Sequence, residues 1–223
     1  YNSGNFQKAI GFWNTVREKR NEDADICEKI GNAYCGLEDF NEAARYWNKA
    51  ISYAGNDPHL HHKLGIAYSK MNKTQEAIFQ WQKAVELESD HFEAHLNLGI
   101  AYYNMQKYDE ALVEWEKAKS LNASDPDIYF KLGHVYRQKR KLDEAIINWK
   151  RTIELDPNNP NTHFVLGNAY DEKGMLDDAI MSWRRVTDLA PNDVDAHNNL
   201  GIAYFHKNMF DQAISEWLDA IRI

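Results

Sequence analysis

The sequence has little of what membrane proteins and nucleic-acid-binding proteins depend on. Its 223 residues contain five prolines, two cysteines and no long apolar run. A transmembrane helix needs about 20 consecutive apolar residues, so we predict no membrane insertion. The formal net charge is −8, which is opposite to the dense basic stripe that nucleic-acid binding requires. We therefore predict no nucleic-acid partner.

The two cysteines are too far apart to pair. Cys27 and Cys35 are eight residues apart in a segment that we expect to be one helix. At about 1.5 Å per residue their Cα atoms would be about 12 Å apart, whereas a disulfide requires about 7 Å or less. We predict two reduced thiols, a result that leaves the cellular compartment open.

Sequence signatures of catalysis are also missing. There is no Gly-x-Gly-x-x-Gly loop, no P-loop and no Gly-x-Ser-x-Gly nucleophile motif. The 34 acidic residues are expected to lie mostly on solvated helix faces. We predict that the chain is not an enzyme and uses no cofactor.

What the sequence does have is a strict internal period of 34 residues. Periods of this length are typical of repeat arrays, in which each unit packs only on its neighbours. When each unit is numbered from 1, glycine recurs at position 8, tyrosine at position 11, alanine at position 20 and tryptophan at position 24. The tryptophans are Trp13, Trp47, Trp81, Trp115, Trp149, Trp183 and Trp217.

Each unit is predicted to contain two helices. Positions 4, 7, 8 and 11 follow the period of one helix face, and positions 20, 24 and 27 mark a second helix. A short polar stretch such as Asn72-Lys73 separates the two, and Pro58 and Pro126 stand at position 1, where a helix start tolerates proline. We call them helix A and helix B. Small residues at positions 8 and 20 would let the two helices approach closely.

This pattern resembles the tetratricopeptide repeat family over the whole chain. At the family positions for leucine (7), glycine (8), tyrosine (11) and alanine (20), the six units depart from the motif only at Ile30. The family's tryptophan at position 4 is missing, and we interpret the tryptophan at position 24 as an exchange of volume between the two helices. We expect the position-4 histidines to be structural and to contact these tryptophans. Position 4 is occupied by Cys27, His61, His95, Tyr129, His163 and His197.

The resemblance implies an all-α fold, a right-handed superhelical solenoid of antiparallel helix pairs with about six and a half repeats. Since the chain begins at Tyr1 within a partial repeat, we expect a processed product or a fragment of a longer protein. We assign one array to residues 1–223, with a partial repeat at 1–23 and repeats at 24–57, 58–91, 92–125, 126–159, 160–193 and 194–223.

The resemblance also implies where a partner would bind. In tetratricopeptide proteins, positions 2, 5, 6, 9, 12 and 13 of helix A line a concave groove in which peptides dock; we call this surface the helix-A face. Positions 2, 5, 9 and 12 point opposite to the packed stripe, and positions 6 and 13 flank them. Apolar residues gather on this face from the third repeat onward. The candidate peptide-binding residues are Leu96, Asn97, Ile100, Tyr103, Phe130, Lys131, His134, Arg137, Phe164, Val165, Asn168 and Asn199.

We therefore predict a non-catalytic protein–protein interaction scaffold that binds a peptide or partner helix in this groove. One alternative is a self-associating assembly platform, because the last helix B ends in Ile221, Arg222 and Ile223 with no polar capping helix after it. Another is a regulatory or substrate-binding arm of a larger enzyme. A homo-oligomer formed through the array ends is compatible with the first alternative.

Two more specific hypotheses are set aside. His59 and His62 share a helix face and could hold a metal ion with a third ligand, but no Cys-x-x-Cys or His-Glu-x-x-His motif accompanies them, so we predict no metal site. Chaperone-binding members of the family use a two-carboxylate clamp. Asn168 and Asn199 match two of its positions, but Phe164 stands where the clamp needs lysine. We do not expect a receptor for chaperone C-termini.

Overall fold

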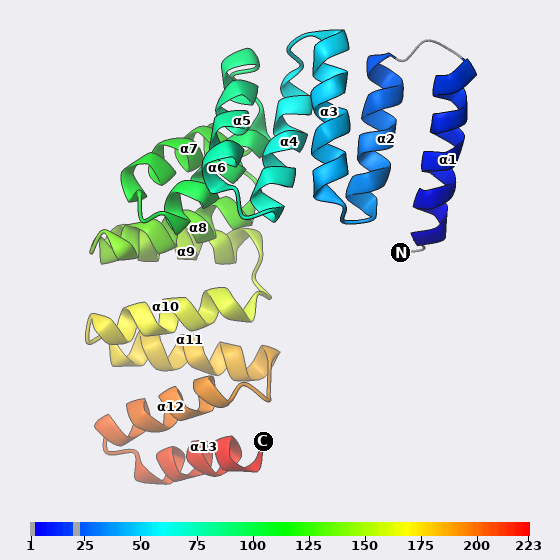
Figure 1. Cartoon of the computed structure of the whole chain (residues 1–223). Helices are drawn as coiled ribbons and strands as arrows, with labels where there is room; N and C mark the ends of the chain where they lie inside the picture. Colours follow the sequence, from blue (N-terminus) through cyan, green and yellow to red (C-terminus); the bar gives the residue numbers. More distant parts are fainter. Residues whose placement is uncertain (1–2, 20–22) are drawn as a thin grey trace. The chain divides into compact units, whose positions relative to one another are not determined.

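The computed structural model describes residues 3–19 and 23–223, and these residues form thirteen α-helices and no strand. The prediction of an all-α repeat fold is confirmed. The chain divides into two compact units, Tyr1–Leu121 with helices α1 to α7 and Asn122–Ile223 with helices α8 to α13 (Figure 1). The helices are α1 (Ser3–Lys19), α2 (Ala24–Gly36), α3 (Phe40–Ala54), α4 (Pro58–Lys70), α5 (Thr74–Leu87), α6 (Phe92–Asn104), α7 (Tyr108–Leu121), α8 (Pro126–Gln138), α9 (Leu142–Leu155), α10 (Pro160–Glu172), α11 (Leu176–Leu189), α12 (Val194–His206) and α13 (Phe210–Arg222).

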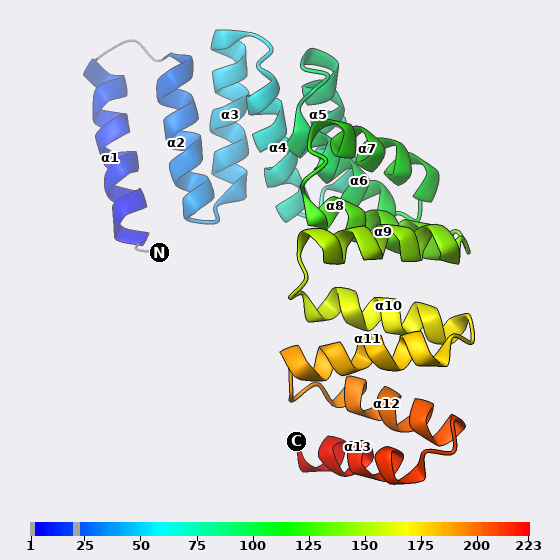
Figure 2. The same cartoon turned by 180° about the vertical axis from the view of Figure 1, so that it is seen from behind.

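These two compact parts, Tyr1–Leu121 and Asn122–Ile223, are called the first and the second unit from here on, and the 34-residue segments are called repeats. Within each unit, a helix packs mainly against its neighbours in the sequence. In the first unit α1, α2, α3 and α4 lie side by side in chain order, and in the second unit α10 to α13 follow one another in the same way (Figures 1 and 2). Even-numbered helices from α2 to α12 are helix A of a repeat, and the helix that follows each is helix B. The assignment of residues 1–223 to one continuous array stays a prediction.

Most A helices begin at a side chain that caps them. In α12, the Asp193 carboxylate accepts a hydrogen bond from the backbone N–H of Ala196 at 2.9 Å. A cap of this kind stabilises a helix by about 1 kcal/mol. Helix α6 is different, because its N-cap residue His91 forms no side-chain cap bond. The capping residues of the other A helices are Asp23, Asp57, Asp125, Asn159 and Asp193.

The turn from helix A to helix B has the same backbone geometry in every repeat. The residue at position 15 has a positive φ, and the next amide donates to the tyrosine carbonyl at position 11, as from Lys141 to Tyr136 at 2.9 Å. This is the Schellman arrangement, which satisfies carbonyls at a helix C-terminus. Only Gly174 adopts the left-handed conformation without steric cost. The residues at position 15 are Glu38, Asn72, Gln106, Arg140, Gly174 and Asn208.

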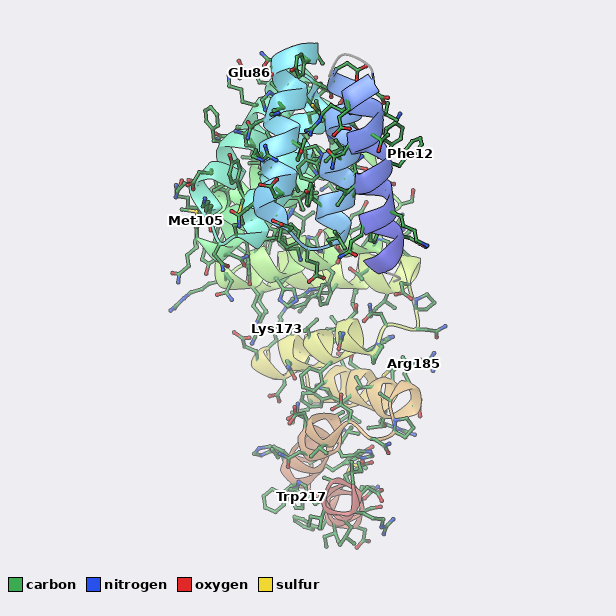
Figure 3. The ribbon with its side chains drawn as sticks, turned by 45° about the vertical axis from the view of Figure 1, so that its right-hand side comes forward. Phe12, Glu86, Met105, Lys173, Arg185 and Trp217 are labelled. Atoms are coloured by element: carbon green, nitrogen blue, oxygen red, sulfur yellow. The ribbon has the colours of Figure 1, made fainter. Side chains whose placement is uncertain are left out.

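The position-8 glycines pack directly against the position-24 tryptophans. A Cβ built on Gly31 would stand 2.7 Å from the indole Nε1 of Trp47, and one on Gly167 would stand 2.6 Å from that of Trp183. Side-chain Cβ atoms essentially never approach other atoms within 3.0 Å. The close approach of helices A and B thus has a specific cause, because the indole of helix B lies across bare backbone of helix A. The other pairs are Gly65–Trp81, Gly99–Trp115, Gly133–Trp149 and Gly201–Trp217, the last on α13 (Figure 3).

The buried indoles also have hydrogen-bond acceptors on helix A. The Nε1–H groups of Trp81, Trp115 and Trp149 each donate at 3.2 Å to the backbone carbonyl at position 5. Where position 9 is asparagine, the indole N–H donates to the asparagine side-chain oxygen instead, as from Trp183 Nε1 to Asn168 Oδ1 at 3.1 Å. A buried tryptophan normally finds such a partner for its N–H group. The tryptophans therefore serve packing and hydrogen bonding inside each repeat.

Candidate functional site

On the helix-A face of the first unit, the four candidate residues of α6 lie close together but differ in exposure. Ile100 has 38% of its surface exposed, whereas Leu96, Asn97 and Tyr103 are half-buried. The Asn97 amide nitrogen lies 3.0 Å from His62 Nε2, a hydrogen-bond distance that links α6 to α4. The ring of Tyr103 contacts that of Trp115, with centroids 5.9 Å apart. In this part of the face, exposed Ile100 therefore lies among residues whose side chains are held by contacts within the protein.

A cleft opens beside Ile100. It has a volume of about 210 Å³, and the helix-A faces of α4 and α6 form its walls. Ile66, at the same repeat position as Ile100, faces it, and Trp81 of α5 contributes to its lining. Sequence reasoning missed Ile66, although the repeat numbering places it at position 9. The remaining lining residues are Ser69, Lys70, Thr74, Ala77, Asn97, Ala101 and Asn104.

In the second unit, three apolar candidates are less accessible than expected. Phe130, Phe164 and Val165 are half-buried and pack against a core cluster built around Trp149 and Trp183. The expectation that Phe130 and Phe164, at position 5, point opposite to the packed stripe is wrong. Positions 5 and 6 flank the stripe, and a large helical side chain leans over the turn that precedes it. These rings therefore extend the core rather than stand free above it.

The polar candidates Lys131, Arg137, Asn168 and Asn199 all have partners within the second unit. Lys131 forms an ion pair with Asp127, and Arg137 Nη2 lies 3.4 Å from a carboxylate oxygen of Glu172. The side-chain oxygen of Asn168 accepts from the Trp183 indole, as described above. It also accepts from the Asn199 amide at 3.3 Å. Its oxygen is already engaged within the protein.

Two histidines on the helix-A face favour the neutral form. Burial, followed by the charges of Arg137 and Lys131, lowers the pKa of His134. Burial, followed by the neighbouring His91, lowers the pKa of His62 to about 4. His134 also contacts two aromatic rings edge-on, Phe130 with centroids 4.6 Å apart and Trp149 with centroids 5.4 Å apart. Both imidazoles therefore contribute aromatic surface rather than positive charge at neutral pH.

The position-4 histidines His61, His95 and His197 each lie within hydrogen-bond distance of a polar group of helix B and of another in the preceding loop. His95 Nδ1 lies 2.7 Å from a carboxylate oxygen of Glu114, and its Nε2 lies 3.2 Å from the Ser89 carbonyl. His197 repeats this arrangement with Glu216 at 2.7 Å and the Pro191 carbonyl at 3.0 Å. These partners give the histidines a structural role. The partner residue is the one just before the tryptophan, not the tryptophan itself.

Each of the two compact units also has exposed apolar residues on its B helices, which the sequence reasoning missed. Position 22 is apolar and well exposed in four successive repeats, and the same 34-residue spacing would have revealed it. In the second unit, Met181 of this column also lines a cleft of about 540 Å³ together with Lys150 and Arg185. The column consists of Phe79 (54% exposed), Val113 (67%), Ile147 (65%) and Met181 (71%).

The last helix, α13, also carries an exposed apolar stripe. Its only buried residue is Ala213, and the exposed residues recur at helical spacing. Such a stripe marks the side of a helix that a neighbour would cover. The stripe consists of Phe210 (50% exposed), Ile214 (54%), Leu218 (52%) and Ile221 (81%).

The fold and these surfaces define a class of protein, a helical-repeat scaffold for protein interactions. A family model described as TPR repeat matches residues 67–106, 102–139, 133–174 and 167–208, more than half of the chain. The chain belongs to the tetratricopeptide repeat family. Proteins with this fold are generally non-catalytic interaction scaffolds. No curated protein matches the sequence.

Solved structures of tetratricopeptide proteins resemble the chain. YrrB, described as a TPR protein with an unusual peptide-binding site, is 28% identical, with a TM-score of 0.70 over 80% of this chain and 92% of its own. The C-terminal part of a TPR repeat-containing protein from Cytophaga hutchinsonii has 18% identity and a TM-score of 0.86, covering 98% and 90%. MamA from Desulfovibrio magneticus RS-1 has 24% identity and a TM-score of 0.69, covering 76% and 96%. None of the described helices is both long and apolar enough to span a membrane.

Proposed function

We propose that the helix-A face of the first unit binds an extended peptide segment of a partner protein. The peptide places an apolar side chain in the cleft between Ile66 and Ile100, above Trp81. That cleft is the single observation that carries the proposal. Most of its lining comes from the A helices α4 and α6, including positions 9, 12 and 13, which the family uses for its groove.

The chemistry of the cleft favours a peptide over a small molecule. Its volume of about 210 Å³ is below the roughly 300–1,000 Å³ of typical small-ligand pockets. Asn97 and Asn104 line the cleft beside its apolar residues, and their amide groups suit the hydrogen-bonding groups of a peptide main chain. Lys70 lines the same cleft. An acidic residue next to the apolar anchor would complement its charge.

The likeness to YrrB supports the same reading. That protein is described as having a peptide-binding site, and the identity of 28% extends over 80% of this chain. The candidate residues of the second unit belong to the proposal as a further contact region. They are Phe130, Lys131, His134, Arg137, Phe164, Val165, Asn168 and Asn199.

The test selects peptides from a random library on the intact chain and measures their dissociation constants. Replacing exposed Ile100 by glutamate should weaken binding by about tenfold or more, or about 1.4 kcal/mol, because it places a charge in the apolar cleft. The matched control is Val113→Glu, which places the same charge at another exposed β-branched apolar residue, on helix B. Loss of binding only in the helix-B variant, or no selected peptide at all, would contradict the proposal.

A second candidate function is self-association through α13. The apolar stripe of Phe210, Ile214, Leu218 and Ile221 supports it, because the same stripe of a second copy could cover it. Sedimentation velocity of the intact chain should then show dimers whose fraction rises with concentration. Ile221→Glu should abolish them, while Val113→Glu should not. Monomers at all concentrations would exclude this candidate.

A further inference from the structure

His91 occupies a place where the other A helices have a capping residue. It precedes α6 and makes no cap hydrogen bond, whereas aspartate or asparagine caps α2, α4, α8, α10 and α12. The His91 side chain is 3% exposed, and neither ring nitrogen has a hydrogen-bond partner. The Glu93 carboxylate stands 3.4 Å from Nδ1 without forming a hydrogen bond. A buried imidazole whose two nitrogens have no hydrogen-bond partner is costly, and a group that engaged them would stabilise the fold.

A second buried polar atom without a partner lies beside it. Oε2 of Glu88, at the end of α5, is buried and also has no hydrogen-bond partner. A backbone hydrogen bond from the N–H of His91 to the carbonyl of Glu88, 3.1 Å long, holds the two residues in one turn. The backbone of this turn therefore fixes the positions from which the Glu88 and His91 side chains extend.

Helix α4 supplies the third group. His59 is exposed, and its ring centroid lies 5.1 Å from that of His91. One ligand atom each from His59, Glu88 and His91 lie within 4.8 Å of one another. His62 is close as well, with its ring 4.8 Å from that of His91, but its Nε2 is within hydrogen-bond distance of Asn97. We do not count it among the ligands.

Contrary to the sequence-based expectation of no metal site, we propose that His59, Glu88 and His91 bind one divalent transition-metal ion of the zinc class. Two imidazole nitrogens and one carboxylate oxygen suit zinc, whereas magnesium and calcium prefer oxygen ligands alone. Metal–ligand bonds of about 2.0–2.2 Å in a tetrahedron put the ligand atoms about 3.3 Å apart. Rotation of the exposed His59 side chain can supply the contraction from 4.8 Å. Three protein ligands leave the fourth position for water or another ligand.

The site is independent of the proposed peptide cleft. None of its three ligands lines that cleft, so loss of one activity leaves the other to be judged separately. Bound metal would join α4 to the turn between α5 and α6, and it should raise the unfolding temperature because only the folded chain assembles the three ligands.

The experiment titrates the intact, tag-free chain with Zn²⁺ by calorimetry and with Co²⁺ by visible absorption. We expect one saturable Zn²⁺ site per chain, a Co²⁺ spectrum of a four-coordinate ion, and no binding of Mg²⁺ at the same concentrations. His59→Asn and Glu88→Gln should each weaken Zn²⁺ binding by about tenfold or more. Both should remove the rise in unfolding temperature that Zn²⁺ causes.

His206→Asn is the matched control, since His206 is also exposed and lies on another helix A, α12. It should bind Zn²⁺ like the wild type. Helical circular dichroism of every variant excludes unfolding as the cause of lost binding. Absence of a saturable site in the wild type would overturn the proposal, and so would unchanged affinity in both His59→Asn and Glu88→Gln.

Discussion

The indole of Trp115 occupies the space in which a Cβ atom of residue 99 would stand. Position 99 therefore requires glycine because of the Trp115 indole on helix B, and not because of the backbone conformation of Gly99. The same relation recurs in six repeats. It accounts for the joint recurrence of glycine at position 8 and tryptophan at position 24.

The Gly99→Ala variant tests this contact. We expect it to lower the free energy of unfolding by about 1–3 kcal/mol, the usual cost of forcing an extra methyl group into a packed core. The control is Gly11→Ala in α1, where nothing lies within 4 Å of the added Cβ. Alanine at that helical position should be neutral or stabilise by up to about 1 kcal/mol. Urea unfolding measures both, and equal effects of the two substitutions would contradict the contact.

The repeat period made the fold predictable, because glycine, alanine, tyrosine and tryptophan each serve packing and must recur with it. The exposure of individual side chains was harder to predict. Phe130 shares the helix-A face with Ile100 in the repeat numbering, yet it is half-buried against the core while Ile100 is exposed. Side-chain size and neighbours decide such cases. The unpartnered state of His91 depends on α4, α5 and α6 together, so periodicity could not indicate it.

The turn at position 15 gives a prediction for stability. Arg140 has a φ of 59°, and a left-handed conformation costs a residue with a Cβ about 1–2 kcal/mol. Asparagine tolerates this conformation better and already stands there in two other repeats, as Asn72 and Asn208. Arg140→Asn should therefore raise the free energy of unfolding by about 0.5–1 kcal/mol. Asn208→Ala should lower it, and thermal unfolding of the two variants would reveal opposite shifts.

The pair of His197 and Glu216 predicts a pH dependence. Burial alone would lower the pKa of His197, but hydrogen bonds to the Glu216 carboxylate and the Pro191 carbonyl outweigh burial and raise it. A raised folded-state pKa stabilises the fold fully below the unfolded value of about 6.5, and this contribution is lost as pH rises through the folded-state pKa. The stability difference between wild type and Glu216→Gln should thus be largest near about pH 6 and shrink towards about pH 8.5. A difference that grows with pH would contradict the pair's role.

The hydrogen bond between Trp183 and Asn168 predicts coupling between two positions. Asn168→Ala leaves the buried indole N–H without its acceptor, which should cost about 1–2 kcal/mol. In the background of Trp183→Phe, which removes the donor, the same substitution should cost much less. A double-mutant cycle from urea unfolding measures this difference. Additive effects would mean that the bond of 3.1 Å contributes nothing.

The tryptophans hold helices A and B of each repeat together, and we propose that the helix-A face beside Ile100 recognises a peptide. The most direct measurement follows the tryptophan indole N–H resonances of ¹⁵N-labelled protein while a library-selected peptide is added. Trp81 lines the cleft, whereas Trp217 belongs to the last helix. We predict that the Trp81 resonance shifts with saturation at the peptide's dissociation constant while that of Trp217 stays in place. A saturable shift at Trp217 with none at Trp81 would contradict the account.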